Sequence, residues 1–358
     1  MHHGHVLAVL AGLPAASVHC VVTSPPYWGL RDYGLEPQVW PDGWRGSLGL
    51  EPTPELYVAH LVEVFRAVRR VLRKDGTLWL NLGDNYAGAP PGNARPDHSG
   101  PRFLGTRDGQ KMSKTARAAA GREFAPLKPK DLVLMPARVA LALQADGWWL
   151  RADIVWAKLN PMPESVTDRP TRSHEYLFLL ARSERYYYDA EAIAEPLSAA
   201  SLVRLSQPSF DDQRGGPKDY GPDANRSMRR GIEHLKRRRS GNKARDIPAA
   251  DDGRGIPNDH RGRGIPWEDD GQGRNARTVW EIGTQPYLEA HFATFPEELA
   301  RRCILAGSRP GDTVLDPFGG SGTVAQVATG HGRDALYIDL NPAYLELARQ
   351  RIGPLLCR

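Results

Sequence analysis

The strongest constraint on the fold is a strand that runs into a glycine-rich turn and then a helix near the C-terminus. Thr313–Asp316 is short and apolar, 317–322 holds three glycines, and 322–328 has helical spacing of its apolar residues. The pattern repeats at once, with a strand expected over 335–339 and a helix over 342–351. Strands that alternate with helices predict a mostly parallel sheet covered on both faces. We therefore expect a doubly wound α/β fold.

The earlier part of the chain shows the same alternation. A buried strand is expected over Val18–Thr23, and Thr53 is suited to cap the helix that follows. The pair Asp75-Gly76 predicts a turn before the next strand, and the polar, glycine-rich segment 83–129 predicts a long loop. The expected elements are strands at 18–23, 77–82, 149–156 and 176–180, and helices at 54–72, 131–144 and 296–306.

Composition favours a globular protein outside the membrane. Of the 358 residues, 41% are hydrophobic and 25% are charged, which allows an ample core. No apolar run approaches the ~20 residues of a membrane-spanning helix, and the first five residues lack the layout of a secretory signal. Cys20, Cys303 and Cys357 form no Cys-x-x-Cys pair, so we expect reduced thiols and no metal site. These features predict a cytoplasmic location.

The net charge of +5 comes from one segment. Residues 201–277 hold 17 Lys and Arg against 12 Asp and Glu, and eight of those basic residues lie in 229–245. Two interpretations stay open on charge alone: a solvated insertion, or an arm that lies along a nucleic-acid backbone. The candidate DNA-binding residues are Arg229, Arg230, Lys236, Arg237, Arg238 and Arg239.

The glycine-rich turn is a candidate nucleoside site. Its glycines let the backbone approach a ligand closely, with the N–H groups of the next helix exposed. The following strand ends in Asp339, which can accept hydrogen bonds from both hydroxyls of a ribose. The turn departs from the G-x-G-x-x-G pattern for a pyrophosphate, so S-adenosylmethionine is the best candidate; a purely structural turn is the alternative. The candidate cofactor residues are Asp316, Phe318, Gly320, Gly322, Thr323 and Asp339.

A proline pair follows the first predicted strand directly, in the run Ser24-Pro25-Pro26-Tyr27. Two prolines remove two backbone donors, so the carbonyls of Ser24 and Pro25 can point into a pocket. The Ser24 hydroxyl adds an acceptor for an exocyclic amino group, and the Tyr27 ring offers a face on which a base can stack. A turn that binds nothing is the alternative. Ser24, Pro25, Pro26 and Tyr27 are therefore candidate residues of a pocket for a base that carries an amino group.

Together, the early Ser-Pro-Pro-Tyr loop and the late Asp-Pro-Phe-x-Gly-x-Gly turn resemble the β group of DNA amino-methyltransferases. The segments 81–84, 153–161, 169–180 and 291–296 also look like this family, so the resemblance covers nearly the whole chain. It implies a seven-stranded-type sheet with circularly permuted motifs. It also implies that Ser24, Pro25, Pro26 and Tyr27 are the catalytic residues and that Thr294 and Phe295 contact the cofactor.

The resemblance divides the chain into three parts. It implies a catalytic half at 1–195, a partly flexible target-recognition insertion at 196–278, and a cofactor-binding half at 279–358. One departure concerns the N-terminus, where Gly4-His5 stands in place of the family's Gly-Asp. Either the usual first strand is absent or the contact with adenine is weaker, so we expect moderate cofactor affinity.

The resemblance implies a site-specific methyltransferase that acts on double-stranded DNA and binds near the nucleoid. Ser24 before the prolines favours the N4 atom of a flipped cytosine, with the N6 atom of adenine as the alternative. A DNA-binding protein that has lost catalysis is less favoured. A protein-glutamine methyltransferase ranks far behind, and an RNA methyltransferase has no separate RNA-binding module in its support. A homodimer and a restriction endonuclease partner are further expectations.

Overall fold

The computed structural model describes residues 1–30, 32–87, 127–196, 274–285 and 295–353. The chain divides into two compact units, Met1–Ile193 with Arg277–Arg358, and Ala194–Ala276. The most basic stretch, 229–245, lies in the second unit and outside the described residues, and it includes all six candidate DNA-binding residues.

The first unit is built on one eight-stranded sheet with the order β1-β10-β9-β2-β5-β7-β6-β8. All neighbouring strands pair in parallel except β7, which is antiparallel to both β5 and β6. The sheet is therefore mostly parallel, as predicted. Its strands are β1 (His2–His3), β2 (Val18–Thr23), β5 (Leu72–Leu82), β6 (Trp149–Lys158), β7 (His174–Ala181), β8 (Val279–Ile282), β9 (Thr313–Asp316) and β10 (Asp334–Asp339).

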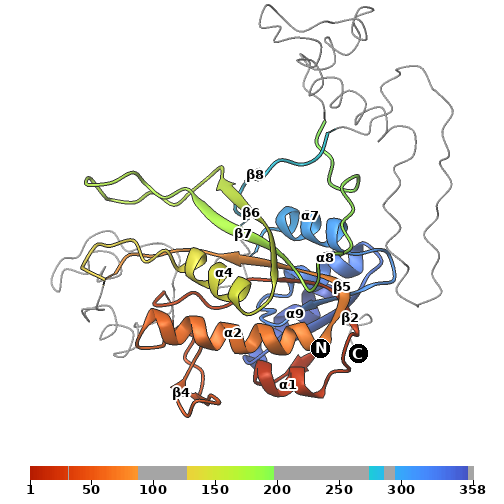
Figure 1. Ribbon diagram of the computed structural model, residues 1–358, viewed down its shortest axis with the longest axis horizontal. Helices are drawn as coiled ribbons and strands as arrows, with labels where there is room; N and C mark the ends of the chain where they lie inside the picture. The colour runs from red at the N-terminus through yellow and green to blue at the C-terminus, as the bar shows by residue number, and fades with distance from the viewer. Residues whose placement is uncertain (31, 88–126, 197–273, 286–294, 354–358) are drawn as a thin grey trace, which may run out of the picture. The chain divides into compact units, whose positions relative to one another are not determined.

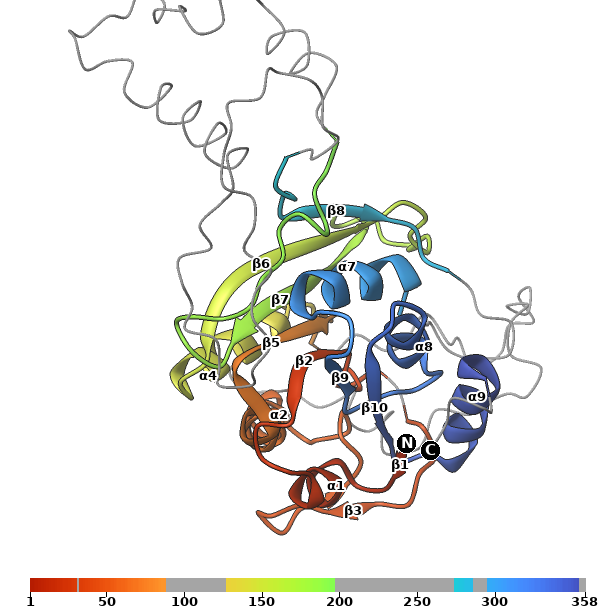
Figure 2. The ribbon, with the colours of Figure 1, turned by 90° about the vertical axis from the view of Figure 1, so that its right-hand side faces the viewer.

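Helices cover both faces of this sheet (Figures 1 and 2). One layer holds α1 (Val6–Gly12), α2 (Pro54–Val71) and α4 (Met135–Ala145), and the other holds α7 (Glu297–Gly307), α8 (Thr323–Gly330) and α9 (Pro342–Ile352). A separate two-stranded ribbon pairs β3 (Gln38–Val39) with β4 (Arg45–Gly46). The doubly wound α/β fold is confirmed.

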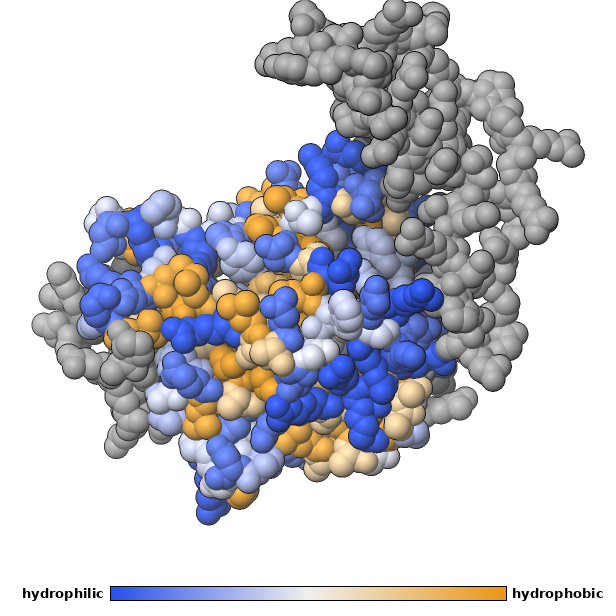
Figure 3. Space-filling model, viewed as in Figure 1, coloured by the Kyte–Doolittle hydropathy of each residue, from blue (hydrophilic) through white to orange (hydrophobic). Residues whose placement is uncertain are grey.

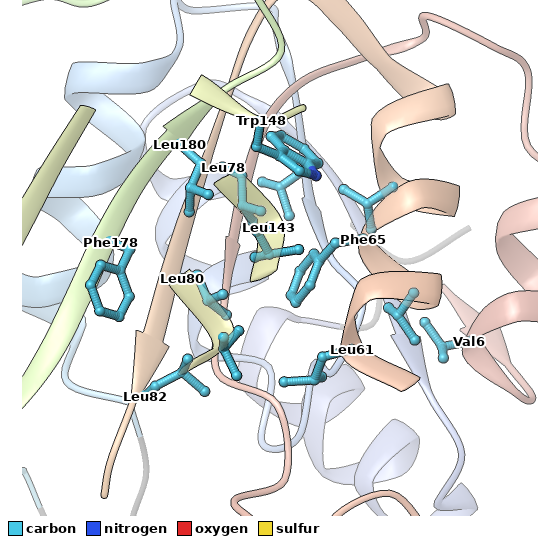
Figure 4. Close-up of a cluster of buried hydrophobic side chains, with 14 of the residues drawn as sticks. Val6, Leu61, Phe65, Leu78, Leu80, Leu82, Leu143, Trp148, Phe178 and Leu180 are labelled. Atoms are coloured by element: carbon cyan, nitrogen blue, oxygen red, sulfur yellow. The ribbon is translucent and has the colours of Figure 1, made fainter. Parts of the chain in front are cut away.

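Apolar spacing on α2 explains how one layer attaches to the sheet. The helix starts at Pro54, and the hydroxyl of Thr53 accepts a hydrogen bond from the backbone N–H of Leu56, so the predicted cap is confirmed. Its buried face includes Leu61 and Phe65, which pack with side chains of β5 and α4 in the cluster of Figure 4. The outward face of this layer mixes hydrophilic and hydrophobic residues (Figure 3). Within the described residues, no helix is long and apolar enough to cross a membrane.

Two predicted boundaries were wrong, for local reasons. The helix expected from residue 131 begins at Met135, because Leu134 takes a left-handed conformation with a φ of 57° just before it. The turn expected at Asp75-Gly76 is part of β5, which follows α2 directly. The pairing with β2 shifts register there, and a Cβ on Gly76 would lie 2.9 Å from the carbonyl oxygen of His19. The glycine therefore marks a bulge in the strand and not a turn.

Several short or edge elements were not expected from the sequence, namely β1, α1, β3, β4 and β8. The strands at Val18–Thr23 and Thr313–Asp316 match their predicted bounds. A two-residue strand, β1, precedes Gly4-His5 and pairs with β10. Cys20 and Cys303 are buried free thiols, and Cys357 lies outside the described residues.

Substituting Gly307 tests how closely α7 approaches the sheet. A Cβ at this position would lie 2.7 Å from the Cys20 sulfur, 2.8 Å from the Thr77 hydroxyl and 2.8 Å from the Trp79 ring nitrogen. We expect Gly307→Ala to lower the free energy of unfolding by about 1–3 kcal/mol through overpacking. Urea denaturation measures this change. Gly330→Ala is the matched control, because a Cβ there has no neighbour within 4 Å, and equal stabilities of the two variants would contradict the prediction.

Candidate active site

The parallel strands β2, β9 and β10 end at the same edge of the sheet, and predicted site residues lie at their ends. Ser24 comes directly after β2, Asp316 ends β9, and Asp339 ends β10. The hydroxyl of Thr23, the last residue of β2, donates a hydrogen bond of 2.7 Å to Asp316 Oδ1. This contact joins the proline loop to the glycine-rich turn across 293 positions of sequence. The carboxyl end of an open α/β sheet is where such folds bind ligands.

The glycine-rich turn is held against the end of β10. The backbone N–H of Gly320 donates to Asp339 Oδ2 at 2.8 Å, and the Tyr337 hydroxyl donates to the Gly320 carbonyl at 2.6 Å. Gly320 and Gly322 have φ values of 50° and 80°, where glycine is favoured. A Cβ on Gly322 would lie 2.7 Å from that of Ala348 in α9, so the turn has no room for a side chain there.

This turn fits a nucleoside cofactor in two respects. No described side chain caps the N-terminus of α8 at Gly322, so its first N–H groups remain available to a ligand. Asp339 is half-buried, and each of its oxygens accepts one backbone N–H, from Gly320 and Asn341. A carboxylate oxygen has two lone pairs, so Asp339 keeps acceptor capacity for ribose hydroxyls. Burial raises the pKa of Asp339.

Asp316 lies deeper than Asp339 and holds the two segments together. Its side chain is buried, and one oxygen accepts from both the Thr23 hydroxyl and the Phe318 backbone N–H. Burial raises the pKa of Asp316 to about 7, although these two hydrogen bonds act in the opposite direction. Asp316 is thus a joint between the loop and the turn, and a cofactor contact by its side chain stays a prediction.

The proline loop is held in place by hydrogen bonds to α2 and to the segment that precedes α2. The Pro26 carbonyl accepts a 2.8 Å hydrogen bond from the Tyr57 hydroxyl, and the Trp28 ring nitrogen donates to the Glu51 carbonyl at 2.9 Å. Pro25 is buried and Ser24 is half-buried. Because its support comes from rigid elements, the loop can present Ser24 in one position.

A buried histidine supports the same segment. His60 of α2 contacts the carboxylates of Glu51 and Asp42 at 2.9 and 3.3 Å, and its ring stacks on Trp40. Burial lowers the pKa of His60, but Glu51 and Asp42 outweigh burial and raise it overall. The His5 and Trp40 rings meet edge to face, with their centroids 5.0 Å apart. Burial lowers the pKa of His5, so this ring is neutral at neutral pH.

Tyr27 is anchored at both its ring and its hydroxyl. A Cβ on Gly83 would lie 2.5 Å from the Tyr27 ring, so the ring packs directly on that glycine. The Tyr27 hydroxyl donates to Glu175 Oε2 at 2.6 Å and accepts from the Ser24 hydroxyl at 3.2 Å. Burial, followed by the negative charge of Glu175, raises the pKa of the Tyr27 phenol. Tyr27 therefore keeps its proton at neutral pH.

Three polar residues complete this cluster, namely Asn81, Lys158 and Glu175. None of them was expected in the site from the sequence. Glu175 of β7 accepts from Tyr27, from Asn81 of β5 at 3.0 Å and from Lys158 of β6 at 2.5 Å. All three lie in segments that resemble the family. The signal that could have found them is a charged or amide residue at the end of an otherwise apolar strand.

Two further predicted cofactor residues, Thr294 and Phe295, come directly before α7. Phe295 is half-buried just before α7, and Thr294 lies outside the described residues. Among residues that the structure describes, no group of three or more His, Cys, Asp and Glu side chains is arranged to hold a metal ion.

The sequence matches the family described as DNA methylase over residues 18–350. It is 42% identical over 354 residues to the Type II methyltransferase M.Cfr9I of Citrobacter freundii, covering 98% of this chain and 87% of that protein. It is 40% identical over 351 residues to M.SmaI of Serratia marcescens, covering 98% and 89%. Among solved structures, PvuII DNA methyltransferase, described as cytosine-N4-specific, aligns with a TM-score of 0.54 at 16% identity, over 99% of this chain and 86% of that one. The likeness to PvuII concerns the fold.

The titration of Asp316 predicts a pH-dependent stability. Its folded pKa of about 7 lies above the ordinary value of 3.8, so the folded protein binds this proton more tightly than the unfolded chain does. The free energy of unfolding must then fall as the pH rises from about 4 to 7. Asp316→Asn keeps an acceptor for Thr23 and Phe318 without the charge. We expect it to raise stability above pH 7 by on the order of 2–4 kcal/mol, and this gain to disappear as the pH falls toward 4.

Urea denaturation at several pH values measures this gain. Asp334→Asn is the matched control, because Asp334 is exposed at the start of β10. If Asp316→Asn and Asp334→Asn change stability equally at every pH, Asp316 is not protonated in the folded protein.

Proposed function

We propose, on the premise that this chain belongs to the β group of DNA amino-methyltransferases, that it methylates the N4 atom of a flipped cytosine in double-stranded DNA. The family match and the relatives show a DNA methyltransferase of the N4/N6 amino type with S-adenosylmethionine as cofactor. The choice of cytosine and the roles of individual residues are our proposal. The hydrogen bond between Thr23 and Asp316 supports it best, because it sets the serine loop beside the cofactor turn.

The proposed chemistry follows from the weakness of the nucleophile. The lone pair of an exocyclic amino nitrogen is delocalised into the ring, so the nitrogen attacks poorly. The Ser24 hydroxyl and the Pro25 carbonyl would accept its hydrogens and turn it toward a tetrahedral geometry, which frees the lone pair. This interaction strengthens as positive charge builds on the nitrogen, so it favours the transition state over the ground state.

The bound cofactor supplies an electrophilic methyl group, and the turn residues would hold it. Gly320, Gly322 and Asp339 are proposed to bind its nucleoside part, with Phe318 and Thr323 beside them. A base inside a duplex cannot reach this site, so the target must be flipped out. Tyr27 is the proposed wall of the base pocket, with its ring fixed on Gly83.

Cytosine is favoured over adenine because the residue before the two prolines is serine. An uncharged hydroxyl is a modest acceptor, which suits either base physically, so the preference follows the family resemblance. Mass spectrometry of nucleosides from DNA treated with the protein and S-adenosylmethionine tests the proposal. N4-methylcytosine is the expected product. If N6-methyladenine is found instead, adenine is the target base. If neither base is methylated, the protein binds DNA without catalysing methyl transfer.

The segment 196–278 is proposed to recognise the DNA target through phosphate contacts and arginine–guanine pairs. The relatives M.Cfr9I and M.SmaI are Type II methyltransferases by name, so a restriction endonuclease of the same specificity is the proposed partner. A homodimer and a location at the nucleoid are proposed with it.

Removing the Ser24 hydroxyl tests its role as an acceptor. We expect Ser24→Ala to lower kcat by about 10²- to 10³-fold, the usual effect of losing one transition-state hydrogen bond. The Kd for S-adenosylmethionine should hardly change, because the cofactor turn is untouched. Transfer of labelled methyl groups to DNA and calorimetry give the two quantities. Ser17→Ala, at the other end of β2, is the matched control, and unchanged turnover in Ser24→Ala would refute the assigned role.

Neutralising three arginines tests the basic segment. We expect replacement of Arg237, Arg238 and Arg239 by alanine to weaken DNA binding and to reduce the slope of log K against log salt by about 2–3, because each lost phosphate contact removes roughly 0.9 from it. Fluorescence anisotropy over a range of salt concentrations measures both.

A charge-matched triple variant provides the control. Lys74, Arg185 and Arg349 are exposed residues of the first unit, and their replacement by alanine removes the same net charge. If both triple variants lose the same affinity and slope, the effect comes from net charge and the segment makes no specific contact.

A further inference from the structure

We infer that Glu175, acting through Tyr27, fixes the direction of the Ser24 hydroxyl so that Ser24 meets the target base only as a hydrogen-bond acceptor. This inference deepens the proposed function and rests on it. Glu175 would be a positioning residue, since it acts through another side chain. Its position on β7, 151 residues from Ser24 in a different strand of the same sheet, brings it to the site only in the folded protein.

Glu175 is surrounded by hydrogen-bond donors. Oε2 accepts from the Tyr27 hydroxyl at 2.6 Å and from Asn81 at 3.0 Å, and Oε1 accepts from the Lys158 ammonium at 2.5 Å. Only 14% of the Glu175 side chain is exposed. A carboxylate that faces an ammonium group and two further donors can act only as an acceptor.

The direction of each proton then follows along the chain of hydroxyls. Tyr27 has one hydroxyl proton, which it donates in its hydrogen bond to Glu175. The oxygen of Tyr27 is left with lone pairs, so it must accept at the 3.2 Å contact with Ser24. Ser24 therefore donates its only hydroxyl proton to Tyr27. The Ser24 oxygen then has only lone pairs left for other hydrogen bonds, so it can only accept. A free serine hydroxyl could donate or accept, but this one is set as an acceptor.

This direction would select for the chemistry of the base. Cytosine N4 and adenine N6 carry amino hydrogens that an acceptor can bind. The O4 of thymine and the O6 of guanine carry lone pairs and would meet the lone pairs of Ser24 with no proton between them. Sites that are built for one hydrogen-bond direction reject the opposite partner strongly, because their polar groups are left unpaired. Glu175 thus contributes to the choice of an amino group as substrate.

Glu175→Gln tests this direction with a minimal change of shape. The Lys158 ammonium should draw the amide oxygen to its own side and turn the amide NH2 toward Tyr27. Tyr27 would then donate to Ser24, and the Ser24 proton would point at the amino group of the base. We expect kcat to fall by about 10- to 100-fold, with the Kd for S-adenosylmethionine unchanged. Methyl transfer to unmethylated bacteriophage λ DNA provides the kinetics.

Two further variants separate this role from simple support of the loop. Tyr27→Phe keeps the ring on Gly83 but removes the hydroxyl, and we expect a fall in kcat of about 10-fold. In that background Glu175→Gln should cost nothing more, because the connection to Ser24 is already gone. Lys158→Met in the Glu175→Gln background should restore part of kcat, because the amide is then free to turn its oxygen back to Tyr27 and Asn81.

Exposed Glu281 of β8 gives the matched control, since Glu281→Gln makes the same chemical change outside the cluster and should leave kcat unchanged. The inference is overturned if Glu175→Gln keeps full turnover, or if its effect is undiminished in the Tyr27→Phe background. Turnover that survives in Tyr27→Phe would instead mean that only the ring matters, as a stacking surface. These outcomes require that the unsubstituted protein is active. If it makes neither N4-methylcytosine nor N6-methyladenine, the proposed function itself is wrong.

Discussion

The site depends on one buried hydrogen bond, from the hydroxyl of Thr23 to the carboxyl of Asp316. β2 and β9 are neighbours in the sheet and run in parallel, so their carboxyl ends must emerge side by side. The bond fixes what each strand does next, a proline loop on one side and a glycine turn on the other. The bond requires the Asp316 carboxyl group to be buried away from water. This burial disfavours the charged form and raises the pKa of Asp316 to about 7.

The order of the strands explains how a permuted chain can assemble this site. The proline loop comes from the start of the chain and the cofactor turn from its end. In the sheet, however, the C-terminal strands β10 and β9 lie between the N-terminal strands β1 and β2. The short β1 matters here, because the Gly4 N–H that follows it donates to the Asp339 carbonyl. The N-terminus is thereby tied to the strand that carries the proposed ribose acceptor.

The sequence was enough to predict the parts that depend on local pattern. Buried strands such as Val18–Thr23 are continuous apolar runs, and the proline pair and glycine turn restrict the backbone wherever they occur. The sequence could not give the contacts that depend on tertiary packing. Glu175 and Lys158 meet only because β7 pairs antiparallel with β6, and Gly76 is a bulge in β5 only because of its neighbours on β2. A two-residue strand such as β1 has no periodicity to detect.

The two carboxylates near the loop explain why serine suits its first position. Thr23 contacts Asp316 on one side, and Tyr27 contacts Glu175 on the other. An aspartate at position 24 would bring a third acid to the same few residues and would compete with Glu175 for the single proton of Tyr27. A serine adds no charge and takes its direction from the acid beyond Tyr27. In the proposed mechanism the negative charge of Glu175 therefore stays one residue away from the amine, and the group that would meet the amine is the neutral oxygen of Ser24, whose proton points to Tyr27.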